Sequence, residues 1–125
     1  MALLLNVTAV AHRPIGSSGS YGLNLLVLVT ASSGAPYGGL TQEHFHVKVM
    51  PSNMEPVDGV VDHVNELARQ NPAKWPAGLY AVLLDKPNHF SSNDYYSLLI
   101  QVRRFPSSGR GLSDQGQTLV GVDYR

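Results

Sequence analysis

The longest apolar run of the chain alternates in a way that predicts a buried β-strand. Residues 21–30 read Tyr-Gly-Leu-Asn-Leu-Leu-Val-Leu-Val-Thr, with glycines before and after the run. Because side chains alternate between the two faces of a strand, one face would be apolar throughout and would face a core. That face holds Leu23, Leu25, Val27 and Val29. Leu26 and Leu28 indicate that the second face is partly covered, so we expect a central strand of a sheet.

The same period of two recurs along the chain and predicts more strands. We expect them at residues 3–11, 40–50, 78–85, 94–104 and 117–124. Segment 40–50 alternates most clearly between inward and outward positions. Its inward residues would be Glu43, Phe45, Val47 and Val49, and its outward ones His44, His46, Lys48 and Met50. On segment 94–104 the inward face would hold Tyr96, Leu98, Ile100 and Val102.

Residues 57–70 fit two structures. Helical spacing connects Val57, Val60, Val61, Val64, Leu67 and Ala68, and Asp58 stands near a plausible N-cap. The abundance of valine and the strands on either side favour an extended chain instead. We expect a strand or an irregular crossing segment, with one short helix at 57–70 as the alternative.

Together these segments predict an all-β fold, an antiparallel sandwich of about seven strands. Twelve glycines and eight prolines suit the turns of such a fold. At 125 residues the chain is long enough for one core, so we expect a single domain over residues 1–125. Loops of Gly, Ser and Pro are expected at 13–22, 32–39 and 105–116.

Two stretches resemble bacterial immunoglobulin-like domains. Residues 35–47 read Ala-Pro-Tyr-Gly-Gly-Leu-Thr-Gln-Glu-His-Phe-His-Val, and residues 76–84 read Pro-Ala-Gly-Leu-Tyr-Ala-Val-Leu-Leu. They are similar to the family patterns G-x-P-V-x-G-L-T-x-x-x-F-x-V and P-G-x-Y-x-V-x-L. The resemblance covers about residues 22–123 and implies an immunoglobulin-like sandwich. Because these motifs are turn and core positions, they imply a fold and not an activity.

The chain departs from the family pattern at Tyr37, where a small aliphatic residue is usual. Residues 56–72 are also longer and more helix-like than the pattern implies. Tyr96, two residues before Leu98, has the position of a tyrosine corner, with an ordinary aromatic at the edge of the core as the alternative.

Charge and composition narrow the classes of partner. Nine basic and nine acidic residues give a formal net charge of zero, which argues against strong binding to nucleic acid or to a membrane surface. Neutrality leaves little repulsion between copies, so a homodimer through strand edges is a possible state. The absence of cysteine excludes disulfides and thiolate chemistry. We recognise neither a signal peptide nor a membrane-spanning segment.

His44 and His46 are the sharpest candidate for chemistry. On a strand, an H-x-H pair places both imidazoles on one face, where they could share a metal with a third ligand. Cupin barrels carry G-x5-H-x-H followed by Glu; Gly38 and both histidines fit, but Met50 and Pro51 stand at the Glu positions. Because isolated short motifs are weak signals, we favour a solvent-exposed strand face that holds His44 and His46. We therefore expect no metal and no cofactor.

Two other groups of residues have both a functional and a structural interpretation, and a third group has a structural one. Trp75 with Phe90 would make an aromatic ledge for a sugar or a partner, or Trp75 closes the end of the sandwich. Arg103 and Arg104 would bind a ligand, or serve solubility. Asp58, Asp62 and Glu66, spaced by four, indicate a solvated surface.

We therefore expect a non-enzymatic binding or assembly module that presents loops or an edge strand to a protein partner. One alternative is a small, cupin-like metal-binding protein that uses His44 and His46. Another is a carbohydrate-binding sandwich. The sequence identifies no partner.

Overall fold

The computed structural model describes residues 3–12, 21–51, 55–85, 95–105 and 113–123. Its strands are β1 (Leu5–His12), β2 (Tyr21–Ala31), β3 (Phe45–Pro51), β4 (Val57–Asp58), β5 (Val61–Glu66), β6 (Leu79–Asp85), β7 (Tyr95–Arg104) and β8 (Asp114–Asp123). Two helical turns accompany them, the 3-10 helix η1 (Gln42–His44) and the helix α1 (Leu67–Gln70). Neither helix of these described segments has the length and apolar character needed to cross a membrane.

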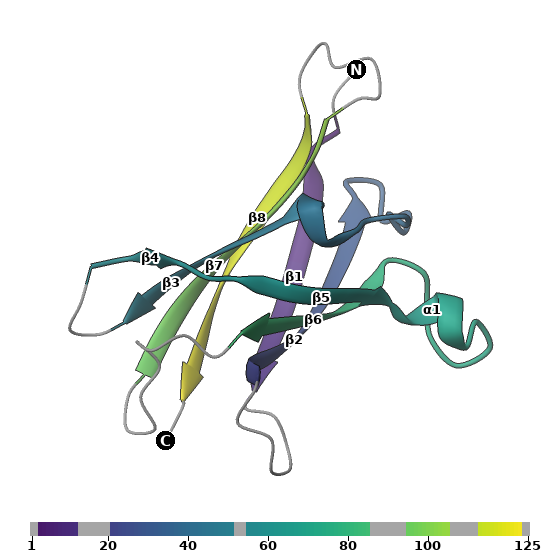
Figure 1. The fold of residues 1–125 in the computed structure, drawn as a ribbon. Helices are drawn as coiled ribbons and strands as arrows, with labels where there is room; N and C mark the ends of the chain where they lie inside the picture. The colour runs from purple at the N-terminus through teal and green to yellow at the C-terminus, as the bar shows by residue number, and fades with distance from the viewer. Residues whose placement is uncertain (1–2, 13–20, 52–54, 86–94, 106–112, 124–125) are drawn as a thin grey trace.

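The strands form two antiparallel sheets, one against the other (Figure 1). The strand order is β1-β2-β6-β5 in the first sheet and β4-β3-β7-β8 in the second. The protein is therefore an all-β sandwich, as the alternating pattern predicts. β2 lies between β1 and β6, which confirms that residues 21–30 form a central strand.

The core lies between the sheets and is built from the inward residues of each strand. On β2 the four expected residues are at most 2% exposed: Leu23, Leu25, Val27 and Val29. The expected face of β7 is buried as well: Tyr96, Leu98, Ile100 and Val102. The rings of Phe45 and Tyr80 meet edge to face with centroids 5.4 Å apart, which joins β3 of one sheet to β6 of the other.

Segment 57–70 is mainly extended, and its helix is confined to the four residues of α1. β4 pairs with β3 in the second sheet, whereas β5 pairs with β6 in the first. The chain changes sheet between them, at Gly59, whose N–H donates to the carbonyl of Val47 at 2.8 Å. The helical spacing of the valines is misleading here. Val61 and Val64 both pack on the core from an extended chain, although they are three residues apart, because β5 has a register shift between Val61 and His63.

Two expected boundaries are wrong. β3 starts at Phe45 and not at residue 40, because residues 42–44 turn into η1 with Thr41 as N-cap. Glu43 is therefore exposed, not inward. β8 starts at Asp114, so the last residues of the expected loop 105–116 belong to a strand.

On the side opposite the crossing segment, the start of the chain joins the second sheet. Leu4 forms a parallel bridge with Gln115, and the N–H of Gln115 donates to the carbonyl of Leu3 at 3.1 Å. The chain then leaves β8 and enters β1. A Cβ at Gly116 would overlap the carbonyl oxygen of Leu5, so this close approach requires glycine.

Candidate functional site

His44 and His46 do not share one strand face. His44 belongs to η1, where its Nδ1 accepts from the N–H of Thr41 at 2.9 Å and thereby caps the turn. Burial lowers the pKa of His44, which favours the neutral, accepting ring. His46 lies exposed on the outer face of β3. The geometric premise of the H-x-H pair is therefore wrong, because β3 begins one residue after His44.

The described residues contain no group of three His, Cys, Asp or Glu side chains that could hold a metal ion. Of the residues whose side chains could supply a third ligand, His63, Asp62 and Glu55 are exposed. His89 lies outside the described residues.

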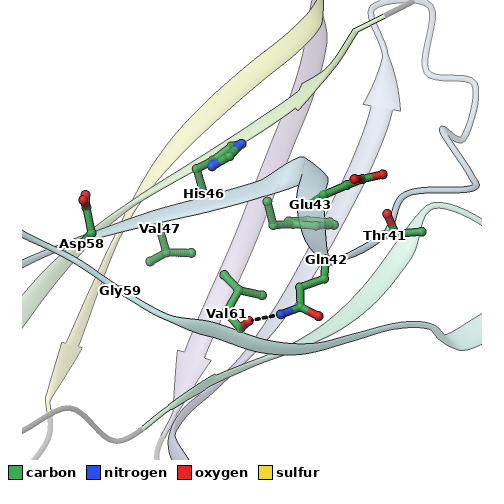
Figure 2. Close-up of a pocket in the computed structure, with 9 residues that line it drawn as sticks. Thr41, Gln42, Glu43, His46, Val47, Asp58, Gly59 and Val61 are labelled. Carbon is green, nitrogen blue, oxygen red and sulfur yellow. Dashed lines mark hydrogen bonds between the residues drawn. The ribbon is translucent and has the colours of Figure 1, made fainter. Parts of the chain in front are cut away.

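An open pocket of about 730 Å³ lies where the chain crosses between the sheets (Figure 2). It is lined by Thr41, Gln42, Glu43, Phe45, His46, Val47, Asp58, Gly59 and Val61. The side-chain amide of Gln42 donates to the carbonyl of Val61 and so links η1 to β5. The five polar side chains around the pocket are all exposed. A preformed ligand site usually aims buried polar groups at one point, and these residues do not.

Trp75 is half-buried in the turn between α1 and β6. Its backbone N–H donates to the carbonyl of Asn71 at 3.0 Å, and Nζ of Lys74 lies 5.0 Å from the ring centroid. Phe90 lies outside the described residues. The aromatic ledge therefore stays a prediction. The one described ring, that of Trp75, is half-buried, and the ammonium group of Lys74 already lies over it.

Arg103 and Arg104 point to opposite faces of β7. Arg103 stands opposite Gln115 on the outer face. The guanidinium of Arg104 lies 6.0 Å from the ring centroid of Tyr37, at the end of the sandwich. Because neighbouring residues of a strand face opposite ways, the pair does not form one basic surface.

Hydrogen bonds that sequence reasoning missed hold the connection between β2 and β3. Tyr80 donates its hydroxyl proton to the carbonyl of Tyr37 at 2.6 Å and accepts from the N–H of Leu40 at 3.2 Å. Burial raises the pKa of Tyr80 to about 12. Glu66 accepts from the N–H groups of Gly39 at 3.1 Å and Gly78 at 3.2 Å. The expectation of a solvated surface holds for Asp58 and Asp62 and is wrong for Glu66, whose side chain is 9% exposed.

Beyond Gln115, the outer edge of β8 pairs with no other strand of the described residues. β8 ends its sheet, and its pairing with β7 runs over ten residues without a register shift. From Gly116 to Val122 it contains no charge and no proline. Natural edge strands usually carry a bulge, a charge or a proline against unwanted pairing, and this stretch lacks all three. Leu119, in its middle, is 69% exposed.

The fold and this edge define the protein as an antiparallel β-sandwich in which the edge of β8 is regular and uncharged beyond the residues that Leu3 and Leu4 cover. Comparison with protein-family models, with curated proteins and with solved structures found no match for this chain. The function is therefore inferred from the geometry of this chain.

Proposed function

We propose that the protein is an immunoglobulin-like, non-enzymatic binding module that accepts an extended segment of a protein partner at the free edge of β8. The observation that carries the proposal is the regular, uncharged course of this edge. The strand order supports the family part of the proposal. With β4 labelled C′ and the other strands labelled A to G in chain order, the sheets read A-B-E-D and C′-C-F-G, the arrangement of immunoglobulin sandwiches.

The backbone of β8 offers its groups to a partner at every second residue. The N–H of Gln115 points away from β7, to Leu3. Residues two apart on an antiparallel strand direct their N–H and C=O groups to the same side. Gln117, Leu119 and Gly121 therefore turn theirs to the free edge. An added strand would bond to these three residues, and Leu119 would supply a side-chain contact beside Leu99, its neighbour on β7.

The two edges on the other side of the sandwich suit this role less well. β4 has two residues, and its Asp58 forms an ion pair with Lys48 at 3.8 Å. β5 pairs with a register shift near its start and carries the exposed Asp62. β1 is the second long edge and is uncharged, but eight residues long. It therefore provides the matched control.

A peptide library tests the proposal. Nine-residue peptides with alternating apolar and polar positions are selected on the immobilised wild-type chain, and the winners are added to labelled protein. We expect slower amide hydrogen exchange at Gln117, Leu119 and Gly121. Gly121→Pro, which removes one edge donor, should abolish binding, whereas Gly121→Ala, which keeps it, should not.

Thr8→Lys adds a charge to the exposed face of β1 and should bind the selected peptides like the wild type. Selected peptides that protect other strands, or that bind Gly121→Pro unchanged, would overturn the proposal. So would a selection that yields no binder.

A further inference from the structure

We infer that the segment bound at this edge is the free C-terminus of a partner protein, with its terminal carboxylate beside Arg103. The inference rests on the proposed function of the β8 edge and names the chemistry and the direction of the partner. The bound strand would run antiparallel to β8 and would end where residues 3–5 close the edge. The closed end and the half-buried arginine beside it support this assignment.

The edge of β8 is closed at its first residues. Leu4 forms a parallel bridge with Gln115, and the carbonyl of Leu3 accepts from the N–H of Gln115 at 3.1 Å. Gln117 is the next residue whose backbone groups face the edge, because these groups alternate along an antiparallel strand. A bound strand must therefore stop or turn away beside Gln117, whichever way it runs.

A pocket of about 490 Å³ lies at this closed end. Leu4 and Leu5 line it from the start of β1, and Gln101, Arg103, Gln115 and Gln117 line it from the second sheet. Arg103 is paired with Gln115, and Gln101 with Gln117, so these four side chains share the outer face of β7 and β8. The pocket thus joins the closed end of the edge to Arg103.

Arg103 makes this pocket suitable for an anion. It is half-buried, and none of the ion pairs among the described residues includes it. Asp114, which precedes Gln115, is engaged by Tyr37 and Leu3. A guanidinium holds a carboxylate through two parallel N–H···O bonds, and their attraction grows as water is excluded. A carboxylate is also the anion that every protein chain carries at its C-terminal end.

Glutamine amides add hydrogen-bond donors beside the arginine. Oε1 of Gln115 accepts from the hydroxyl of Ser113 at 3.4 Å, and Oε1 of Gln117 accepts from Nε2 of Gln101 at 3.2 Å. Neither Nε2 of Gln115 nor that of Gln117 has an acceptor among the described residues. A carboxylate has more acceptor positions than one arginine fills, so these amides can serve the rest.

The charge of Arg103 also decides the direction of the bound strand. A strand antiparallel to β8 brings its C-terminal end to Gln117, whereas a parallel strand brings its N-terminal end there. The guanidinium attracts a terminal carboxylate and repels a terminal ammonium group. A segment from the middle of a partner would have to turn aside at Leu4, but a C-terminus simply ends there. Strand addition and capture of a terminal carboxylate are both established modes of peptide recognition.

Blocking the terminal charge of the peptide tests the inference. The peptides selected on the wild-type chain, from a library with free C-termini, are synthesised once with a C-terminal carboxylate and once with a C-terminal amide. The free acid should bind roughly tenfold more tightly, the usual effect of one hydrogen bond to a charged group. Acetylation of the N-terminus should leave the affinity unchanged. Titration calorimetry with the full chain measures all of these forms.

Two arginine variants locate the bound carboxylate. Arg103→Met should bind the acid and the amide equally, because the guanidinium of the pocket is gone. Arg104→Met removes the same charge from the opposite face of β7 and should still prefer the acid. Circular dichroism of both variants checks that they are folded, and the comparison of acid with amide on the wild type needs neither variant.

The outcomes separate the inference from the proposed function. If the acid and the amide bind the β8 edge equally well, the inference fails and the proposed function stands. The inference also fails if Arg104→Met loses the preference as Arg103→Met does, or if affinity follows the N-terminal block. An amidated peptide that binds as tightly as the acid through an Asp or Glu side chain would likewise exclude a terminal carboxylate. If no peptide binds, both proposals fail.

Discussion

The hydroxyl of Tyr37 donates to Oδ2 of Asp114 at 2.5 Å, which links two residues 77 positions apart. Oδ1 of the same carboxylate accepts from the N–H of Leu3 at 2.7 Å. One side chain thus joins the β2–β3 connection, the start of β8 and the first described residues of the chain. Leu3 and Leu4 thereby cover the beginning of the β8 edge, and the edge is free only beyond them.

Removing this hydroxyl should destabilise the fold. Tyr37→Phe should lower the free energy of unfolding by about 1.5–3 kcal/mol, the usual contribution of a hydrogen bond to a charged group. Asp114→Asn should also destabilise, and the double variant should lose less than the sum of the two. Urea unfolding of the four proteins measures this coupling. Strictly additive losses would contradict the bond.

The same carboxylate should make stability depend on acid. The hydrogen bond from Tyr37, and then that from Leu3, hold the pKa of Asp114 below its usual value of 3.8. Because the folded value is the lower one, the stabilisation is complete well above 3.8 and is lost as the pH falls through the folded pKa. Unfolding free energies measured from neutral to acid pH should fall less steeply for Asp114→Asn than for the wild type, with Tyr37→Phe between them. Parallel profiles would exclude this role.

The same substitution should destabilise the fold at one glycine of β8 and have little effect at another. Gly116→Ala should cost about 2–4 kcal/mol, because the new methyl group would overlap the backbone of Leu5. Gly121→Ala should change stability by less than about 0.5 kcal/mol, since an added Cβ there meets open space. Thermal unfolding of the two variants makes this comparison within one strand. Equal losses of stability in the two variants would show that the backbone of Leu5 does not lie this close to Gly116.

The alkaline limit of stability should depend on Tyr80. Burial raises the pKa of its hydroxyl from 10.0 to about 12. The unfolded chain therefore releases this proton first, and stability is lost as the pH rises from about 10 through the folded value. Absorbance of tyrosinate should show fewer ionised tyrosines near pH 11 in the folded wild type than in urea, and this difference should shrink in Tyr80→Phe. Simultaneous ionisation of Tyr80 with the exposed tyrosines would contradict it.

Much of the fold could be predicted from the sequence because burial in a sandwich obeys a local rule. The inward residues of β2 and β7 repeat at period two, and that pattern alone identifies the strands. Segment 57–70 failed this rule for a tertiary reason. Its chain changes sheet at Gly59, so no single period runs through it. The start of β8 was also missed, because Gly116 resembles a loop residue and is in fact required by the neighbouring strand.

The candidate site was less predictable because it depends on topology. An edge strand has no composition of its own, and Leu119 looks like any core leucine until β8 is known to end its sheet. The H-x-H motif misled for the opposite reason. Its spacing is local, but η1 ends between the two histidines and turns His44 into a cap. The polar spacing of Asp58, Asp62 and Glu66 likewise could not reveal which carboxylate faces inward.

Glu66 should be more costly to replace than the exposed carboxylates Asp58 and Asp62. Its carboxylate accepts two backbone N–H groups, from Gly39 and Gly78, in a position 9% exposed. Both glycines adopt φ angles of 83°, which other residues rarely take, so the two turns depend on this anchor. Glu66→Ala would leave two donors without their acceptor and should cost about 2–4 kcal/mol.

Arg69 provides the matched control for Glu66, because it is the other half of the ion pair. Its Nε lies 3.7 Å from Oε1 of Glu66, and its side chain is 75% exposed. An exposed ion pair contributes less than about 1 kcal/mol, so Arg69→Ala should be nearly neutral. Urea unfolding of both variants separates the two contributions. A large loss in Arg69→Ala with a small one in Glu66→Ala would mean that the charge pair, and not the two backbone bonds, holds the turns together.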